Sequence, residues 1–298
     1  MDGIQLVGIA SAGGSTRNTR AKNLDPKYAT SSEDEIINDP NINTVAILTR
    51  HDSHAELVVK TLKAGKHVFV EKPLAINSDQ LSVISKQLKK TDNCLLMTGF
   101  NRRFAPLRES LRPKSLQSQS PLPCSLPHQR RLPPSTHWTQ DPTSAVDGSS
   151  AKHVISLTSS PSRRRGSRLC DRARVASDGG KYREDNVSMT FTFPDGSIGV
   201  VDYLANGDKS FPKNVWKFFV AEWSQCWMIL FRCKVTRDGK MKEERGAQDK
   251  GWVNEWKAFV KSIREGGEPP IPYEQLIGVT KSTIAAVESL RTMQTIKL

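Results

Sequence analysis

The sequence predicts an α/β fold: a partial doubly wound parallel sheet within residues 1–106, followed by an α+β domain with a mainly antiparallel sheet in residues 107–298. Short apolar runs alternate with amphipathic segments up to residue 106, which is the pattern of repeated β–α–β units. After residue 185 the pattern changes to period-two alternation around a turn, and then to helical periodicity. The 298 residues are enough for two such domains, and a hydrophobic fraction of 37% allows each a packed core.

Four apolar runs in the first half predict the parallel strands. Thr44–Leu48 (TVAIL) is continuously apolar, which is typical of a strand buried on both faces of a parallel sheet. The other expected strands are Ile4–Ala10, His67–Val70 and Cys94–Met97.

Capping patterns and turn residues predict the helices between these strands. Two Ser-x-x-Glu capping boxes begin at Ser32 and Ser53. The helices that they open are expected to end at Asp39-Pro40 and at Gly65. A third helix is expected over Ser78–Lys90, which has leucine and isoleucine at helical spacing.

The second half contains a hairpin and two terminal helices. Val187–Phe193 and Ile198–Tyr203 alternate with period two on either side of Pro194-Asp195-Gly196, which predicts an antiparallel hairpin. Two apolar stripes then predict helices, the first of which ends at Gly266-Gly267. The first stripe is Trp252, Trp256, Phe259, Val260 and Ile263, and the second is Leu276, Thr280, Ile284, Val287 and Leu290.

The composition argues against several classes of protein. No apolar stretch reaches the roughly 18 residues of a membrane-spanning helix, and the N-terminus lacks the basic region and cleavage site of a secretory signal. Five cysteines without a Cys-x-x-Cys pair indicate neither a disulfide framework nor a zinc site, so no metal is expected. These features predict a soluble cytoplasmic protein.

The positive charge is concentrated in the middle of the chain. The net charge is +13, and residues 112–178 contribute +7 of it with eleven Lys/Arg and four Asp/Glu. This Ser-, Pro- and Arg-rich stretch has no sustained periodicity. Basic chains often bind polyanions, so a nucleic-acid-binding protein is a less favoured alternative function.

A specific motif lies after the third expected strand. Residues 44–75 read TVAILTRHDSHAELVVKTLKAGKHVFVEKPLA, and GFNRRFAP follows at 99–106. With the later runs DNVSMTFTFPDGSIGVVDYLANGDKSFPK and EWKAFVKSIREGGEPPIPYEQL, the chain resembles the Gfo/Idh/MocA family of NAD(P)-dependent oxidoreductases, and within it the inositol and sugar dehydrogenases. The resemblance covers about two thirds of the chain: residues 4–106, 178–213 and 234–298.

The resemblance implies a Rossmann-like dinucleotide-binding domain and hydride transfer between NAD or NADP and a sugar or polyol carbon. Lys72 then becomes the catalytic residue, because a lysine at a strand end can hold and deprotonate the substrate hydroxyl. A lone lysine is more often a solvated surface residue, but the seven residues before and around it favour the catalytic role.

The resemblance also assigns residues to the cofactor. Glu71 is expected near the nicotinamide ribose, the loop at residues 49–54 under the nicotinamide, and residues 101–102 at the mouth between the domains. A structural role for either histidine of the loop is equally open. Ser11 follows the first expected strand, which corresponds to the second strand of dinucleotide folds, where many of them have a carboxylate that binds the adenosine ribose. Arg17 and Arg20 nearby leave NADP open. The positions assigned to the cofactor are Ser11, Thr49, Arg50, His51, His54, Glu71, Lys72, Asn101 and Arg102.

The chain departs from the family pattern in two places. The Gly-x-Gly-x-x-Gly turn and the strand before it are missing, so the chain is expected to be N-terminally truncated. The family's catalytic histidine lies in a run like Gly-Glu-Ala-Cys-His-Phe-Ile-Asp, where this chain has residues 151–158 (AKHVISLT). A catalytically inactive fragment is therefore the main alternative. Relatives imply a homo-oligomer, and some have an upstream alcohol-dehydrogenase-like domain.

Frame-shifted translation is a hypothesis for the irregular tracts near 112–176 and 214–233. Trp and Met have single codons, so residues 226–229 (CWMI) give Leu-Asp-Asp in the frame that joins the last base of each codon to the first two bases of the next, and the family has these residues at this place. A genuine divergent insertion is the alternative. Sequencing the gene distinguishes the two, because a continuous frame through residues 226–229 would exclude the shift.

Overall fold

A computed structural model describes the elements of the fold and most of the segment that contains the motif. The described residues are 3–11, 25–91, 93–106, 123–129, 169–175, 186–192, 198–204, 215–220, 223–228, 232–237, 239–247 and 249–298. Arg17, Arg20, residues 151–158 and the turn at 194–196 lie outside them.

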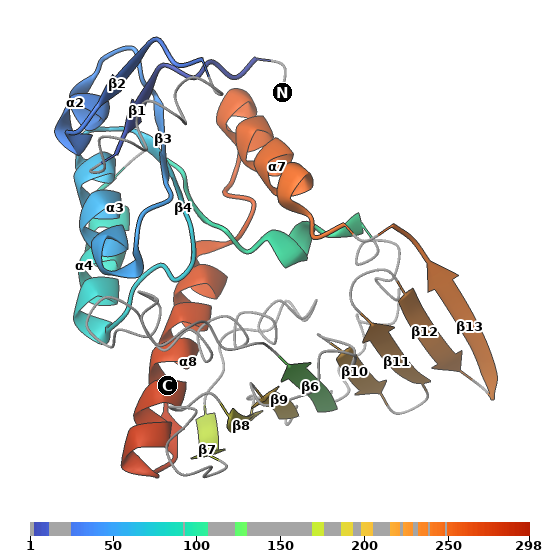
Figure 1. Cartoon of the computed structure of the whole chain (residues 1–298). Coiled ribbons are helices and arrows are strands. Elements are labelled where there is room, and N and C mark those ends of the chain that lie inside the picture. The colour runs from blue at the N-terminus through green and yellow to red at the C-terminus, as the bar shows by residue number, and fades with distance from the viewer. Residues whose placement is uncertain are drawn as a thin grey trace.

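Two small parallel sheets form the N-terminal part (Figure 1). β3 (Thr44–Ile47), β4 (His67–Val70) and β5 (Leu96–Thr98) pair in the order β3-β4-β5, and all three run parallel. β1 (Gly8–Ala10) and β2 (Tyr28–Thr30) form a separate parallel pair. The expected parallel arrangement of this half is confirmed.

Two of the strand predictions in this half need correction, and one strand was not predicted. The first strand covers only Gly8–Ala10, because Ile4 and Leu6 are exposed and have no partner strand in the described pairing. β2 was missed, since three residues of mixed polarity give no apolar run. β5 begins at Leu96 because the amide N–H of Leu95 donates to Nδ1 of His67 at 3.0 Å.

The three helices of this half lie where the sequence predicts them. They are α2 (Glu33–Asn38), α3 (His54–Lys63) and α4 (Ser78–Leu88), and α3 packs beside α4. Ser32 and Ser53 are the N-cap residues of α2 and α3, but neither side chain makes the expected cap hydrogen bond. The hydroxyl of Ser53 donates instead to the carbonyl of Arg50 at 3.0 Å.

A nine-stranded sheet forms the second half, in the order β13-β12-β11-β10-β6-β9-β8-β7-β14. Every pair is antiparallel except β6 with β9, and the predicted hairpin is β8 with β9. The strands are β6 (Pro123–Gln129), β7 (Leu169–Val175), β8 (Asn186–Thr192), β9 (Ile198–Leu204), β10 (Val215–Val220), β11 (Trp223–Met228), β12 (Arg232–Arg237), β13 (Lys240–Arg245) and β14 (Ile296–Lys297).

Four of these strands lie in the tracts whose pattern matches no element. β6 and β7 lie within residues 112–176, and β10 and β11 lie within residues 214–233, where the sequence pattern predicts no strand. β6 pairs along its whole length with β9 but with β10 only at Cys124 and Ser125, and Pro127 lies beyond that short register. Prolines and absent alternation hid the strand from the sequence. The reading-frame hypothesis itself stays a prediction.

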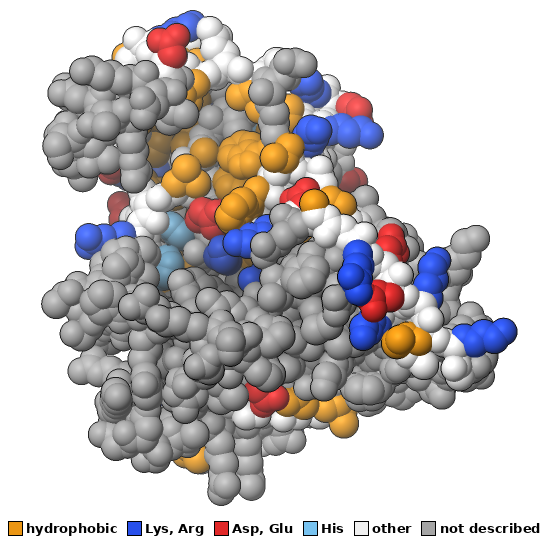
Figure 2. Space-filling view, turned by 45° about the vertical axis from the view of Figure 1, so that its right-hand side comes forward, with side chains coloured by type: hydrophobic (Ala, Val, Ile, Leu, Met, Phe, Trp, Pro, Cys, Tyr) orange, Lys and Arg blue, Asp and Glu red, His pale blue; other side chains and the backbone are white. Residues whose placement is uncertain are grey.

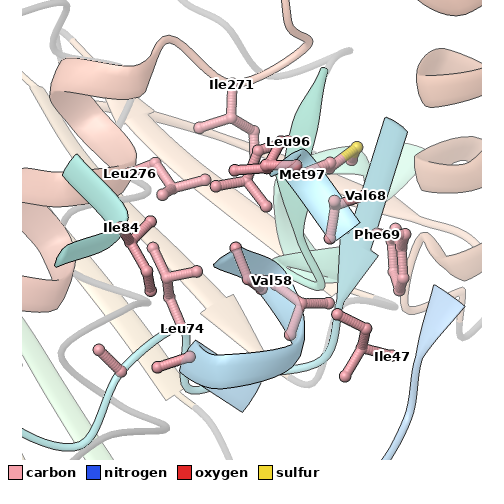
Figure 3. Packing of buried hydrophobic residues seen from close by; sticks show 14 of the residues in the cluster. Ile47, Val58, Val68, Phe69, Leu74, Ile84, Leu96, Met97, Ile271 and Leu276 are labelled. Atoms are coloured by element: carbon pink, nitrogen blue, oxygen red, sulfur yellow. The ribbon is translucent and has the colours of Figure 1, made fainter. Parts of the chain in front are cut away.

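Helix α7 (Trp252–Glu265) and the start of α8 (Tyr273–Thr292) pack with the β3-β4-β5 sheet. Phe259, Ile271 and Leu276 are completely buried in one hydrophobic cluster with residues of that sheet. Figure 3 shows Ile271 and Leu276 beside Leu96. The core that supports the motif is therefore built from both ends of the chain.

The rest of α8 runs on to the large sheet, where it contacts β7 and β14 (Figure 1). The expected stripe of α7 needs one correction: Trp252 is 56% exposed, because it occupies the first turn, beyond the edge of the cluster. Of the helices that are described, none combines the length and apolar character of a membrane span.

Candidate active site

The Glu71-Lys72-Pro73 turn lies at the carboxyl end of β4, the middle strand of its sheet. The amide of Glu71 donates to the carbonyl of Ile47 in β3 at 3.0 Å, and the amide of Gly99 donates to the carbonyl of Val70 at 2.8 Å. Both neighbouring strands thus fix the start of the turn. Ligands of open α/β sheets bind at this edge, outside the carboxyl ends of the strands.

Glu71 and Lys72 form an ion pair at this edge. Nζ of Lys72 lies 3.3 Å from Oε2 of Glu71, and the amide of Lys72 donates to the same oxygen at 3.2 Å. The side chains are 36% and 28% exposed, so both reach solvent. A Cβ at Gly99 would lie 3.1 Å from the Glu71 carboxylate, so the glycine makes room for that carboxylate.

The loop after β3 places its polar residues in two groups. Thr49 and Arg50 are exposed, and the Thr49 hydroxyl lies 2.7 Å from that of Ser53. His51 and His54 are buried, with ring centroids 5.8 Å apart in an edge-on arrangement.

His54 links this loop to the motif turn. Its Nδ1 lies 2.7 Å from the carbonyl oxygen of Pro73, and its Nε2 lies 3.2 Å from that of Thr49. The side chain is completely buried. Both ring nitrogens thus face backbone carbonyls, which argues for a structural role and against direct contact with a cofactor.

The 3₁₀ helix η2 (Asn101–Phe104) follows β5 and joins the strand end to the C-terminal part. Asn101 is buried, and its Nδ2 donates to the carbonyl of Lys250 at 2.9 Å. Its side-chain amide therefore binds the backbone of the C-terminal part and does not face solvent. Burial lowers the pKa of Arg102. Ser11 is half-buried at the end of β1, and its amide donates to the carbonyl of Thr30 at 3.1 Å.

The structure brings eight of the nine assigned positions to the β3-β4-β5 edge and its flanking loops. Ser11 belongs instead to the separate β1–β2 pair. Figure 2 shows histidine, acidic and basic side chains next to one another near the middle of one face, bordered by hydrophobic side chains. Within the described part of the chain, no group of three or more His, Cys, Asp or Glu residues could hold a metal ion.

Sequence reasoning missed Glu255, an acidic residue on the buried face of α7. It is 1% exposed, and its Oε1 has no hydrogen-bond partner among the described residues. Its pKa is raised to about 8, mostly by burial and also by Glu71, while Lys72 acts to lower it. A signal existed: Glu255 is three residues after Trp252 and four before Phe259, so it lies within the apolar stripe.

Comparisons with known proteins agree with the motif. Residues 1–100 match the model of the Gfo/Idh/MocA family, described as "Oxidoreductase family, NAD-binding Rossmann fold". Myo-inositol 2-dehydrogenase of Thermotoga maritima is 46% identical over 70 residues, which are 24% of this chain and 21% of that protein. Inositol 2-dehydrogenase/D-chiro-inositol 3-dehydrogenase of Lactiplantibacillus plantarum is 41% identical over 80 residues, 26% of this chain and 23% of that protein. The match thus spans less than a quarter of the length of these curated relatives.

The fold as a whole has solved counterparts. Levoglucosan dehydrogenase in complex with NADH and levoglucosan superimposes with a TM-score of 0.86, over 99% of this chain and 90% of that one. At 19% identity this likeness shows the fold alone. The matched N-terminal segment, with its Glu-Lys-Pro turn at the carboxyl end of a parallel strand, carries the similarity: residues 1–100 match the Gfo/Idh/MocA oxidoreductase family, whose model describes an NAD-binding Rossmann fold.

Proposed function

We propose that the chain is an NAD(P)-dependent oxidoreductase that transfers a hydride between the nicotinamide and a CH–OH carbon of a sugar or polyol. The observation that carries this proposal is the solvent-reaching Glu71–Lys72 pair at the carboxyl end of the central parallel strand. The names of the relatives, inositol dehydrogenases and a levoglucosan dehydrogenase, support a cyclic polyhydroxy substrate.

The chemistry of the donor set fits the nicotinamide end of such a cofactor. The Glu71 carboxylate would accept hydrogen bonds from ribose hydroxyls, and Gly99, which has no Cβ, leaves room for it at the strand end. Thr49 and Arg50 are exposed on the neighbouring loop and would line the same edge. We also propose that Ser11, after β1, contacts the adenosine part of the dinucleotide. NAD(P), when bound, supplies the acceptor or donor of the hydride.

Lys72 performs the proton transfer in this proposal. In the oxidation direction its amine holds the substrate hydroxyl and takes the proton, while the hydride leaves the same carbon. In the reduction direction its ammonium donates that proton to the carbonyl oxygen. Glu71, whose carboxylate lies 3.3 Å from Nζ, limits the positions that Nζ can take. The buried His54 ring holds the turn in place through the contact of its Nδ1 with the Pro73 carbonyl.

The test compares Lys72→Ala with a matched control, Lys63→Ala, on the full chain. Lys63 is an exposed lysine in the last turn of α3 and makes no contact with the motif in the described structure. Reduction of NAD and NADP is followed with a panel of inositols and anhydrosugars. We expect turnover that falls by roughly 10²- to 10⁴-fold in Lys72→Ala and is unchanged in Lys63→Ala.

A second candidate is a chain that binds the dinucleotide without turnover. It is favoured by the placement of the histidines: among the described residues near Lys72, His51 and His54 are buried, and His54 faces backbone carbonyls. Titration of NADH fluorescence separates the two candidates, because binding without product formation supports the second and contradicts the first. If the chain neither binds NADH nor forms product, both candidate functions are contradicted.

A further inference from the structure

The N-terminal end of α7 is clamped against the loop that follows β5. Nδ2 of Asn101 donates to the carbonyl of Lys250 at 2.9 Å, and Nδ2 of Asn254 donates to the carbonyl of Phe104 at 3.1 Å. Gly251, at a φ of +83°, lies so close that a Cβ would be 2.4 Å from the carbonyl oxygen of Asn101. Backbone contact of this kind fixes both the position and the rotation of the first turn of α7.

A second contact fixes α7 against β4. The ring of Trp256 stacks on Phe69, with centroids 4.3 Å apart and planes at 27°. Phe69 lies two residues before Glu71 on the same strand. Glu255 lies in sequence between these two contacts, on the helix turn that they hold against η2 and β4, and Glu71 and Lys72 are the charged groups that act on its carboxyl group.

The environment of Glu255 is unusual for a carboxyl group. It is 1% exposed, and Oε1 has no hydrogen-bond partner in the part of the chain that the structure describes. A buried, unpartnered carboxylate is costly, and a buried carboxylic acid is much less so. Its electrostatic neighbours are Glu71 and Lys72.

We infer that Glu255 is a positioning residue for Lys72: a buried carboxyl group whose gain or loss of a proton sets the charge beside the Glu71–Lys72 pair. The inference rests on the proposed function of Lys72. With Glu255 neutral, Glu71 is the carboxylate that faces the lysine. With Glu255 ionised, a second carboxylate stabilises the ammonium form, and less of the amine is available to take a proton from a substrate hydroxyl.

The charged groups around Glu255 are consistent with this role. From the turn after β4 they are Glu71, which opposes ionisation of Glu255, and Lys72, which favours it. η2, which packs on α7, carries Arg102 and Arg103, and the guanidinium of Arg103 donates to Gln275 of α8. The burial of Glu255 opposes ionisation more than either neighbour does, and raises its pKa to about 8.

The test measures the reactivity of Lys72 in the full chain without cofactor or substrate. Acetic anhydride acylates the neutral amine, and mass spectrometry gives the rate at Lys72 relative to the exposed lysines. We expect Glu255→Gln to leave the Lys72 rate unchanged near pH 6.5, where Glu255 is already neutral. Near pH 9 we expect a rate roughly five- to tenfold above wild type.

The matched control is Glu265→Gln, an exposed glutamate on the same helix, for which the rate should equal wild type at both pH values. Equal Lys72 rates in Glu255→Gln and wild type at pH 9 would overturn the inference. Because no cofactor is present, loss of the proposed function leaves this test valid. Conversely, if turnover depends on Lys72 but the acylation rate at pH 9 is the same in Glu255→Gln and wild type, the inference is wrong and the proposed function stands.

A measurement on the unmodified chain covers the case in which Glu255→Gln does not fold. With ¹³C at the glutamate side-chain carboxyls, one signal should titrate near pH 8, far above the ordinary range of glutamate. If every glutamate carboxyl of the folded chain titrates below about pH 6, the inference is wrong.

Discussion

Glu71 and Lys72 are the residues at which sequence and structure agree most closely. The motif predicts a strand end followed by a turn, and the turn follows β4 with both side chains reaching solvent. A strongly apolar strand and a glycine-bounded helix frame it, so local sequence determines its place. The ligand-facing role of Lys72 stays a prediction.

Glu255 and His54 could not be placed in the same way. A glutamate in a helical stripe is ordinarily assigned to the exposed face, and only the contact between segments about 150 residues apart in sequence buries it. The sequence left the role of His54 open, because its two carbonyl partners lie in different turns. The pairings of His54 are tertiary and leave no periodic signal, whereas Glu255 lies within the apolar stripe of α7 and could have been found from it.

The pH dependence of stability should report the Glu255 proton. Burial raises its pKa from 4.5 to about 8, so between these values the folded chain keeps a proton that the unfolded chain has lost. Its contribution is fully present below pH 4.5 and is lost as the pH rises through about 8. We expect the free energy of unfolding in denaturant to fall over this window by a few kcal/mol, roughly, more in wild type than in Glu255→Gln.

The control for this prediction is Glu265→Gln, which should keep the wild-type slope. A slope that is the same in wild type and in Glu255→Gln would show that Glu255 is ionised in the folded chain at neutral pH. The comparison of slopes also removes the contribution of all other titrating groups.

At the scale of elements, prediction succeeded where hydrophobic periodicity was strong. β4, α7 and the hairpin of β8 with β9 follow their patterns closely. β2 and β6 failed, since a three-residue strand and a strand with two prolines have no alternation to recognise. Their place is determined by the neighbouring strands with which their backbones pair.

Gly251 tests the clamp between α7 and η2. Its φ of +83° disfavours any side chain, and a Cβ would also meet backbone atoms of Asn101, Phe104 and Ala105 at 2.4–2.5 Å. Gly251→Ala should therefore lower the free energy of unfolding by roughly 3 kcal/mol or more, or prevent folding. Denaturant unfolding monitored by tryptophan fluorescence measures it.

Gly266 is the matched control, because it has a φ of +61° and no atom within 4 Å of a Cβ. Gly266→Ala should cost only the left-handed backbone penalty of roughly 1–2 kcal/mol. If the two alanine variants lose the same free energy of unfolding, the backbone of η2 does not lie as close to Gly251 as the structure has it.

At the scale of the whole molecule, the two ends of the chain complete one core. The hydroxyl of Tyr273 accepts a hydrogen bond from the amide of Leu96 at 3.0 Å and donates to the carbonyl of Cys94 at 3.4 Å. These residues lie more than 170 positions apart. The proposed domain boundary at residue 106 therefore divides the sequence, but side chains from both sides of this boundary pack in the same core.

Tyr273→Phe tests how much the hydrogen bond between Tyr273 and Leu96 contributes to stability. It leaves the amide of Leu96 without its partner while keeping the ring, so we expect a loss of about 1–3 kcal/mol in the free energy of unfolding. Hydrogen exchange at Leu96 should accelerate with it. Unchanged exchange would mean that Tyr273 does not bond the strand in solution.

In the proposed function, Lys72 at the end of β4 serves hydride transfer to a nicotinamide, and isotope transfer tests this role. The full chain is incubated for hours with NAD or NADP and inositols or anhydrosugars deuterated at their CH–OH carbons, and mass spectrometry follows deuterium in the nicotinamide. We expect deuterium transfer by wild type and Lys63→Ala, and its loss in Lys72→Ala. No transfer from any substrate, or equal transfer by wild type and Lys72→Ala, would contradict it.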